Sequence, residues 1–212
     1  MTQATNPQLA DIDYAIDLAR NGAEAPLLGG PIGLMWTGLS VPALLLHGSV
    51  LAGWTDLPES QVGLVWAAYG LVGTVLSVWL GKRIDAKPAA GSFCNRVADA
   101  LWTSAGVLVA TLAISAVLAV TALGAPDILF AFIVPFAFGL STVANAVLSK
   151  VTGQAYLKWA AWSAGAATAV CTLTVARPEM FFLAGAFVFL SGVLPSWLEL
   201  RREREFSAAA SA

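Results

Sequence analysis

The stretch FAFIVPFAFGLSTVANAVLSK, residues 130 to 150, carries no charged side chain before its last residue, Lys150. A bilayer core about 30 Å thick is crossed by a helix of about 20 apolar residues, because each residue adds about 1.5 Å along the helix axis. The stretch meets this length despite its proline and its Ser, Thr and Asn side chains. It therefore predicts one membrane-spanning helix.

The charged residues of the whole chain bracket six uncharged windows of this kind. The windows cover residues 25–55, 60–81, 100–126, 128–149, 159–176 and 180–198. Hydrophobic residues make up 58% of the chain and charged residues only 11%, whereas a soluble domain has about 25% charged residues. A soluble protein with six such helices would have too little polar chain to cover them. The sequence predicts an all-α polytopic membrane protein with six transmembrane helices.

Lysines and arginines fall almost entirely on one side when the six windows cross the membrane in alternation. That side receives Arg20, Lys82, Arg83, Lys87, Arg96, Lys150, Lys158, Arg201, Arg202 and Arg204, and the other side receives Arg177 alone. Cytoplasmic loops carry the excess of Lys and Arg. We therefore expect both termini in the cytoplasm. The Ala-, Val- and Gly-rich composition is typical of bacteria, which suggests the bacterial inner membrane.

Residues 1–30 are predicted to form a short acidic amphipathic helix on the cytoplasmic side, followed by a Pro/Gly hinge. Apolar residues at spacings of three and four place one stripe on this helix, and Asp11, Asp13 and Asp17 occupy its other faces. A basic surface is the expected docking partner. It is either a basic cytoplasmic protein or the chain's own loop 81–96, which contains Lys82, Arg83, Lys87 and Arg96. The alternative is a solvated arm.

The remaining chain divides into a transmembrane bundle, residues 31–198, and a basic cytoplasmic tail, residues 199–212. In the fourth window, a helical periodicity of 100° per residue gathers small and polar residues on one face: Pro135, Gly139, Thr142 and Ser149, with Asn145 at the edge. Lipid cannot satisfy their hydrogen bonds, so this face should turn toward protein. Packing against another helix is the favoured interpretation, and a solute-binding face is the alternative.

Two segments in corresponding halves of the chain resemble each other. VPALLLHGSV covers residues 41–50 and VPFAFGLSTV covers residues 134–143. With three helices per half, this match indicates a possible 3+3 inverted repeat, and proline-interrupted segments at corresponding positions are typical of transporter binding sites. A solute cavity would then lie between the first and fourth helices, near Pro42, Pro135, Thr142 and Asn145.

The chain contains none of the common sequence motifs for catalysis, metal binding or cofactor binding. No ionisable residue lies deep within a window, which disfavours ion-coupled transport. We expect no catalytic residue, no metal, no cofactor and no nucleic-acid partner, whereas an oligomer is compatible with the sequence. The first functional expectation is a non-catalytic inner-membrane protein that assembles with or regulates a protein partner. The alternative is a channel or facilitator for a small neutral or apolar solute, and a lipid-modifying enzyme ranks third.

Overall fold

The chain folds into helices, as its composition predicts. The computed structural model describes residues 25–175 and 177–210, and within these ranges it contains no strand. The α-helices are α2 (Gly30–Leu51), α3 (Glu59–Asp85), α4 (Phe93–Leu123), α5 (Ile128–Ala131), α6 (Ile133–Thr152), α7 (Ala155–Leu173), α8 (Pro178–Val188) and α9 (Leu194–Ala210). A 3₁₀ turn, η1 (Pro88–Gly91), and a π-helical turn, η2 (Phe189–Val193), complete the described elements. The all-α prediction is confirmed.

Five helical stretches are long and apolar enough to cross a membrane. They are Gly30–Leu51, Glu59–Asp85, Phe93–Leu123, Ile128–Thr152 and Pro178–Ala209. The chain is therefore a multi-pass membrane protein. The remaining long helix, α7, is less apolar than these five. The predicted acidic helix with Asp11, Asp13 and Asp17 lies outside the described residues.

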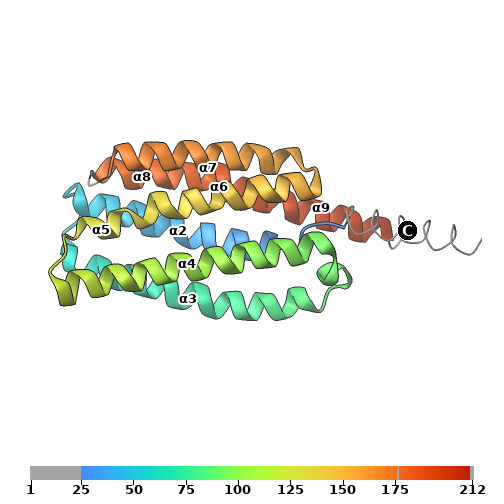
Figure 1. Cartoon of the computed structure of the whole chain (residues 1–212), viewed down its shortest axis with the longest axis horizontal. Helices are drawn as coiled ribbons and strands as arrows, with labels where there is room; N and C mark the ends of the chain where they lie inside the picture. Colours follow the sequence, from blue (N-terminus) through green and yellow to red (C-terminus); the bar gives the residue numbers. More distant parts are fainter. Residues whose placement is uncertain (1–24, 176, 211–212) are drawn as a thin grey trace, which may run out of the picture.

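The long helices lie side by side along the long axis of the molecule, and α9 continues beyond the bundle (Figure 1). Three features gather at the end from which α9 emerges: the extended segment 25–29, the α3–α4 connection and the α6–α7 turn. We call this end the charged end, because Lys82–Arg96, Lys150–Lys158 and Glu199–Glu205 contribute to it. The α2–α3, α4–α5 and α7–α8 turns lie at the opposite end (Figure 1).

Helix pairing follows two rows, α3–α2–α8 and α4–α6–α7, which meet through α7 and α8. Helix α2 packs against α3 on one side and against α8 on the other, and α6 packs against both α4 and α7. Helices α3 and α4 keep many large apolar side chains exposed, such as Leu71 and Ile114. In a bilayer these side chains face lipid, where their exposure has no hydrophobic cost.

Glycines permit the closest helix contacts. A Cβ atom at Gly73 would overlap the ring of Trp36, and one at Gly192 would overlap Thr37. Small residues of this kind let helix backbones approach when lipid surrounds the bundle. The helices α4 and α6 end at Gly124 (φ 67°) and Gly153 (φ 68°), whose left-handed conformation favours glycine.

The π-helical turn η2 has a covalent cause. Pro195 has no backbone N–H, so the regular hydrogen-bond pattern of the helix cannot continue through it. At the residue directly before Pro195, the N–H of Leu194 donates to the carbonyl of Phe189, five residues back. The hydroxyl of Ser191 donates to the Phe187 carbonyl at 2.7 Å. The widened turn lies against α2, α7, α8 and α9, where Gly192 meets Thr37.

Two buried clusters form the core. The first joins α2, α6, α7 and α8 and consists of Leu44, Phe138, Ala164, Ala167, Cys171, Met180, Phe181 and Ala184. The second lies near the charged end and consists of Leu27, Cys94, Ala98, Leu148 and Leu157. The second cluster anchors the extended segment before α2, because Leu27 is part of it.

Candidate functional site

A buried asparagine holds the charged end together. Asn95 accepts a hydrogen bond from the Leu28 backbone N–H through Oδ1 at 2.9 Å. Its Nδ2 donates to the Pro26 carbonyl at 2.9 Å and to the Ala89 carbonyl at 3.1 Å. The segment expected to be a Pro/Gly hinge is thus tied, over residues 26–28, to the start of α4.

The capped start of α4 holds Asn95 in position for these hydrogen bonds. Ser92 is the N-cap of α4, and its hydroxyl accepts a hydrogen bond from the Asn95 backbone N–H at 3.3 Å. Asn95 Nδ2 also donates to the same hydroxyl at 2.9 Å. N-cap hydroxyls of this kind satisfy backbone donors that have no partner within the helix. Asn95 is 8% exposed, so its amide groups depend on these protein partners.

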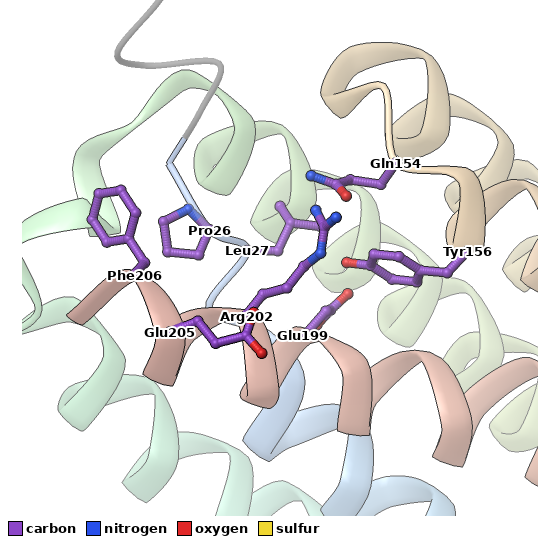
Figure 2. Close-up of a pocket in the computed structure, with 8 residues that line it drawn as sticks. All are labelled: Pro26, Leu27, Gln154, Tyr156, Glu199, Arg202, Glu205 and Phe206. Carbon is purple, nitrogen blue, oxygen red and sulfur yellow. The ribbon is translucent and has the colours of Figure 1, made fainter. Parts of the chain in front are cut away.

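A pocket of about 280 Å³ opens beside this anchor. Three segments line it: the extended segment, the α6–α7 turn with the start of α7, and α9. Its residues are Pro26, Leu27, Gln154, Tyr156, Glu199, Arg202, Glu205 and Phe206. Figure 2 shows that the polar ends of Gln154, Tyr156, Glu199 and Arg202 point toward one another across it.

The charges in the pocket are of both signs. The guanidinium of Arg202 lies 5.6 Å from the centroid of the Tyr156 ring. Within the described ranges, no hydrogen bond or ion pair joins the side chain of Glu199 to another residue. Glu199 and Arg202 are three residues apart on α9, so they lie on one side of the helix. The pocket therefore offers a carboxyl group and a guanidinium that form no ion pair with each other.

An ion pair connects α9 to the loop that was predicted to receive the acidic helix. Lys87 pairs with Glu203, and both side chains are partly buried. On α9 itself, Arg201 pairs with Glu205 at 3.0 Å. The described part of the predicted basic tail is thus helical, and it carries as many carboxylates (Glu199, Glu203, Glu205) as guanidinium groups (Arg201, Arg202, Arg204).

Three of the four predicted docking cations are exposed at the charged end. Lys82, Arg83 and Arg96 are exposed, and Arg83 lies 3.8 Å above the centroid of the Trp79 ring. The described residues contain no ion pair that uses any of the three. The loop therefore retains positive charge after Lys87 has paired with Glu203.

The polar face of α6 lies against α7. A Cβ atom at Gly139 would contact Thr168, and one at Gly165 would contact Thr142. Thr142 donates to the Phe138 carbonyl at 2.9 Å, and Asn145 Nδ2 donates to the Ser141 carbonyl at 3.0 Å. These polar groups therefore use acceptors of their own helix.

The other candidate residues of the proposed solute face do not all meet. Pro135 and Asn145 are buried on α6, and Ser149 is half-buried. Pro42 is exposed on α2. Leu44 of α2 and Phe138 of α6 belong to the same buried cluster. At their level, buried apolar side chains of α2, α6, α7 and α8 pack together.

His47 lies among aromatic rings. Its Nδ1 accepts a hydrogen bond from Trp66 Nε1 at 3.0 Å, and its ring centroid is 3.8 Å from that of Phe181. Among the residues that the structure describes, no group of three or more His, Cys, Asp and Glu is placed to hold a metal ion. Cys94 and Cys171 are both buried free thiols.

The polar pocket and its surroundings are the part of the described chain best suited to binding. They combine an anchored backbone segment, an acidic and a basic side chain without an ion-pair partner among the described residues, and a projecting helix. Sequence reasoning missed Asn95, Tyr156, Glu199 and Glu203, and only the S-x-x-N spacing before α4 could have indicated one of them. Comparison with known proteins finds no family model, no curated protein and no solved structure that matches this chain.

Proposed function

We propose that the chain is a non-catalytic protein of the bacterial inner membrane, with six spans and both termini in the cytoplasm, whose charged end binds and regulates a protein partner. The charge asymmetry supports this orientation, because the Lys- and Arg-rich end would face the cytoplasm. The opposite end of the described chain has Arg177 as its only Lys or Arg.

Helix α7 is the proposed sixth span. Its 19 residues would extend about 28 Å at the rise of an α-helix. It is rich in Ala, Gly, Ser and Thr, which lowers its hydropathy but allows close packing against α6. It also runs alongside the other long helices in Figure 1. A span shielded by two neighbours needs less apolar surface than one that faces lipid.

The projection of α9 is the observation that best supports a protein partner. Beyond Leu200, most side chains of α9 are exposed, and Phe206 is 48% exposed. Arg and aromatic residues are enriched at protein interfaces. An isolated helix of this length is marginal in water, so contacts with a partner would stabilise the projecting turns.

The predicted acidic helix provides a second contact in this proposal. Asp11, Asp13 and Asp17 would meet either the exposed cations Lys82, Arg83 and Arg96 or a basic surface of the partner. Charge complementarity supports both arrangements. If the partner displaced the arm from loop 81–96, binding would be coupled to release of the arm, which is a route to regulation.

A facilitator for a small neutral solute is the second proposal, and it has weaker support. Its cavity would lie between α2 and α6, where Leu44 and Phe138 pack in one cluster. The possible inverted repeat belongs to this second proposal. It draws some support from the pairing of α2 with α3 and α8, which parallels the pairing of α6 with α7 and α4.

The test is co-purification from membranes of the native host in a mild detergent, followed by native mass spectrometry. We expect a second protein in constant stoichiometry with the chain. The double variant Arg201→Glu/Arg204→Glu should lose this protein. Arg177→Glu at the opposite end is the matched control and should retain it. The proposal is wrong if the wild-type chain carries no protein in constant ratio, or if the chain alone accelerates solute flux into vesicles.

A further inference from the structure

The pocket of Figure 2 brings an acidic and a basic side chain into one small space. Glu199 and Arg202 both line it, and neither forms an ion pair with another described residue. Arg202 instead lies over the ring of Tyr156. A site built only for an anion would not contain Glu199 and Glu205, and one built only for a cation would not contain Arg202. The arrangement fits a ligand that carries both charges a short distance apart.

The chemistry of each group specifies the two charges of the ligand. A guanidinium matches the geometry of phosphate oxygens and binds them in pairs, and the Gln154 amide can donate to the same group. The Glu199 carboxylate accepts hydrogen bonds from an ammonium group, and the face of Tyr156 attracts a cation. A primary ammonium supplies the N–H donors that a quaternary ammonium lacks.

The pocket lies at the level where lipid headgroups are expected. Trp159 is three residues after Tyr156 on α7 and is 74% exposed, and Trp197 is two residues before Glu199 and is 48% exposed. Exposed tryptophans are enriched at the headgroup level of membrane proteins. Pro26, Leu27 and Phe206 add apolar walls to the pocket. A ligand from the bilayer therefore has a shorter route to the pocket than a soluble ligand has.

We propose that this pocket binds the phosphoethanolamine group of an aminophospholipid in the leaflet at the charged end, with the phosphate at Arg202 and the ammonium between Glu199 and Tyr156. This binding does not require the protein partner proposed above. Soluble phosphoethanolamine has the same chemistry, and the experiment below separates the two sources.

The experiment is native mass spectrometry of the full chain released from vesicles with equal parts of phosphatidylethanolamine, phosphatidylglycerol and phosphatidylcholine. We expect the wild-type chain to retain phosphatidylethanolamine about tenfold over the other two, the factor that one charge-assisted hydrogen bond can provide. Glu199→Gln should abolish this preference. Arg202→Gln should weaken retention of all three lipids, because each contains the phosphate.

Glu59→Gln, at the opposite end of the bundle, is the matched control and should leave the preference unchanged. Tyr156→Phe keeps the ring and is a second variant in case Glu199→Gln reduces folding; it should preserve more than half of the preference. Addition of free phosphoethanolamine distinguishes the sources: displacement of the bound lipid points to a soluble ligand, and retention points to the lipid. Equal retention of the three lipids by the wild-type chain, or an unchanged preference in Glu199→Gln, would overturn the assignment.

Discussion

Asn95 binds the backbone of Leu28 at 2.9 Å, across 67 positions of the chain. Through the same side chain it binds the Pro26 and Ala89 carbonyls. The entry to the first spanning helix, the α3–α4 connection and the start of α4 therefore share one polar centre. Leu27, between the two residues it holds, is buried against Cys94, Leu148 and Leu157.

Replacement of Asn95 by Ala should loosen this end of the bundle. The substitution removes the partner of the buried Leu28 N–H, and an unsatisfied buried donor costs about 1 to 3 kcal/mol. We expect the free energy of unfolding in detergent to fall by about 2 kcal/mol. Hydrogen exchange should also accelerate at Leu27 and Leu28 more than at the centre of α6.

Thr103→Ala is the control for this prediction, because Thr103 is exposed on the same helix and makes only a 3.5 Å contact with Asp99. It should change stability by a few tenths of a kcal/mol, as surface substitutions do. Equal effects of the two substitutions would show that Asn95 does not anchor the segment.

Gly73→Ala should disturb the contact between α2 and α3. The added methyl group would overlap the Trp36 ring, whose Nε1 donates to Ser77 at 2.9 Å and which packs edge-on against Tyr69. Overpacking of this kind costs about 1 to 3 kcal/mol. A drop of that size in the free energy of unfolding, with altered Trp36 fluorescence, is the expected result.

Gly70 provides a matched position on the same helix. A Cβ atom there would meet no atom within 4 Å, so Gly70→Ala should leave stability unchanged or raise it by up to about 1 kcal/mol through helix propensity. The prediction fails if Gly73→Ala is as well tolerated as Gly70→Ala.

The pair Lys87–Glu203 should contribute more to the position of α9 than the pair Arg201–Glu205. The first joins distant segments, and its side chains are 32% and 17% exposed. The second lies within one helix, with side chains 63% and 62% exposed. A double-mutant cycle to Gln at both positions should give about 1 kcal/mol for the first pair and about 0.3 kcal/mol for the second.

Charge exchange offers an independent measurement of the same contact. Lys87→Glu alone should accelerate hydrogen exchange in α9, and Lys87→Glu/Glu203→Lys should restore the wild-type rate. If the double variant exchanges as fast as the single variant, the ion pair does not fix α9.

The positions of the long apolar helices were predictable because an uncharged segment must reach a minimum length to cross the hydrocarbon core. The predicted window 60–81 corresponds to α3, Glu59–Asp85, and the window 128–149 corresponds to the span Ile128–Thr152. The bilayer core contains no water that could form hydrogen bonds with the backbone. Long apolar segments must therefore satisfy their own backbone groups as helices. The order of charged and uncharged residues is therefore sufficient for this part of the fold.

The charged end was not predictable in the same way. The Gly and Pro residues near position 30 suggested a hinge, but Gly30 serves close packing: a Cβ atom there would lie 2.8 Å from the Ser196 carbonyl of α9. Gly and Pro residues indicate that the chain can bend at a position, but they do not indicate which residues it packs against there. The Asn95 contacts and the Lys87–Glu203 pair join residues 67 and 116 positions apart, and no local pattern encodes such partners.

The proposed six-span topology predicts which turns share a side of the membrane. Single cysteines at Gly91 and Ala155 should react with a membrane-impermeant maleimide only after the cells are permeabilised. Cysteines at Thr55, Asp127 and Glu179 should react in intact cells. All five residues are exposed, and the native Cys94 and Cys171 are buried, so they can be replaced by Ala to lower background. The pair Ala155 and Glu179 tests α7 directly, because these residues flank it. If both react from the same side, α7 does not cross, and the two ends of the chain lie on opposite sides of the membrane.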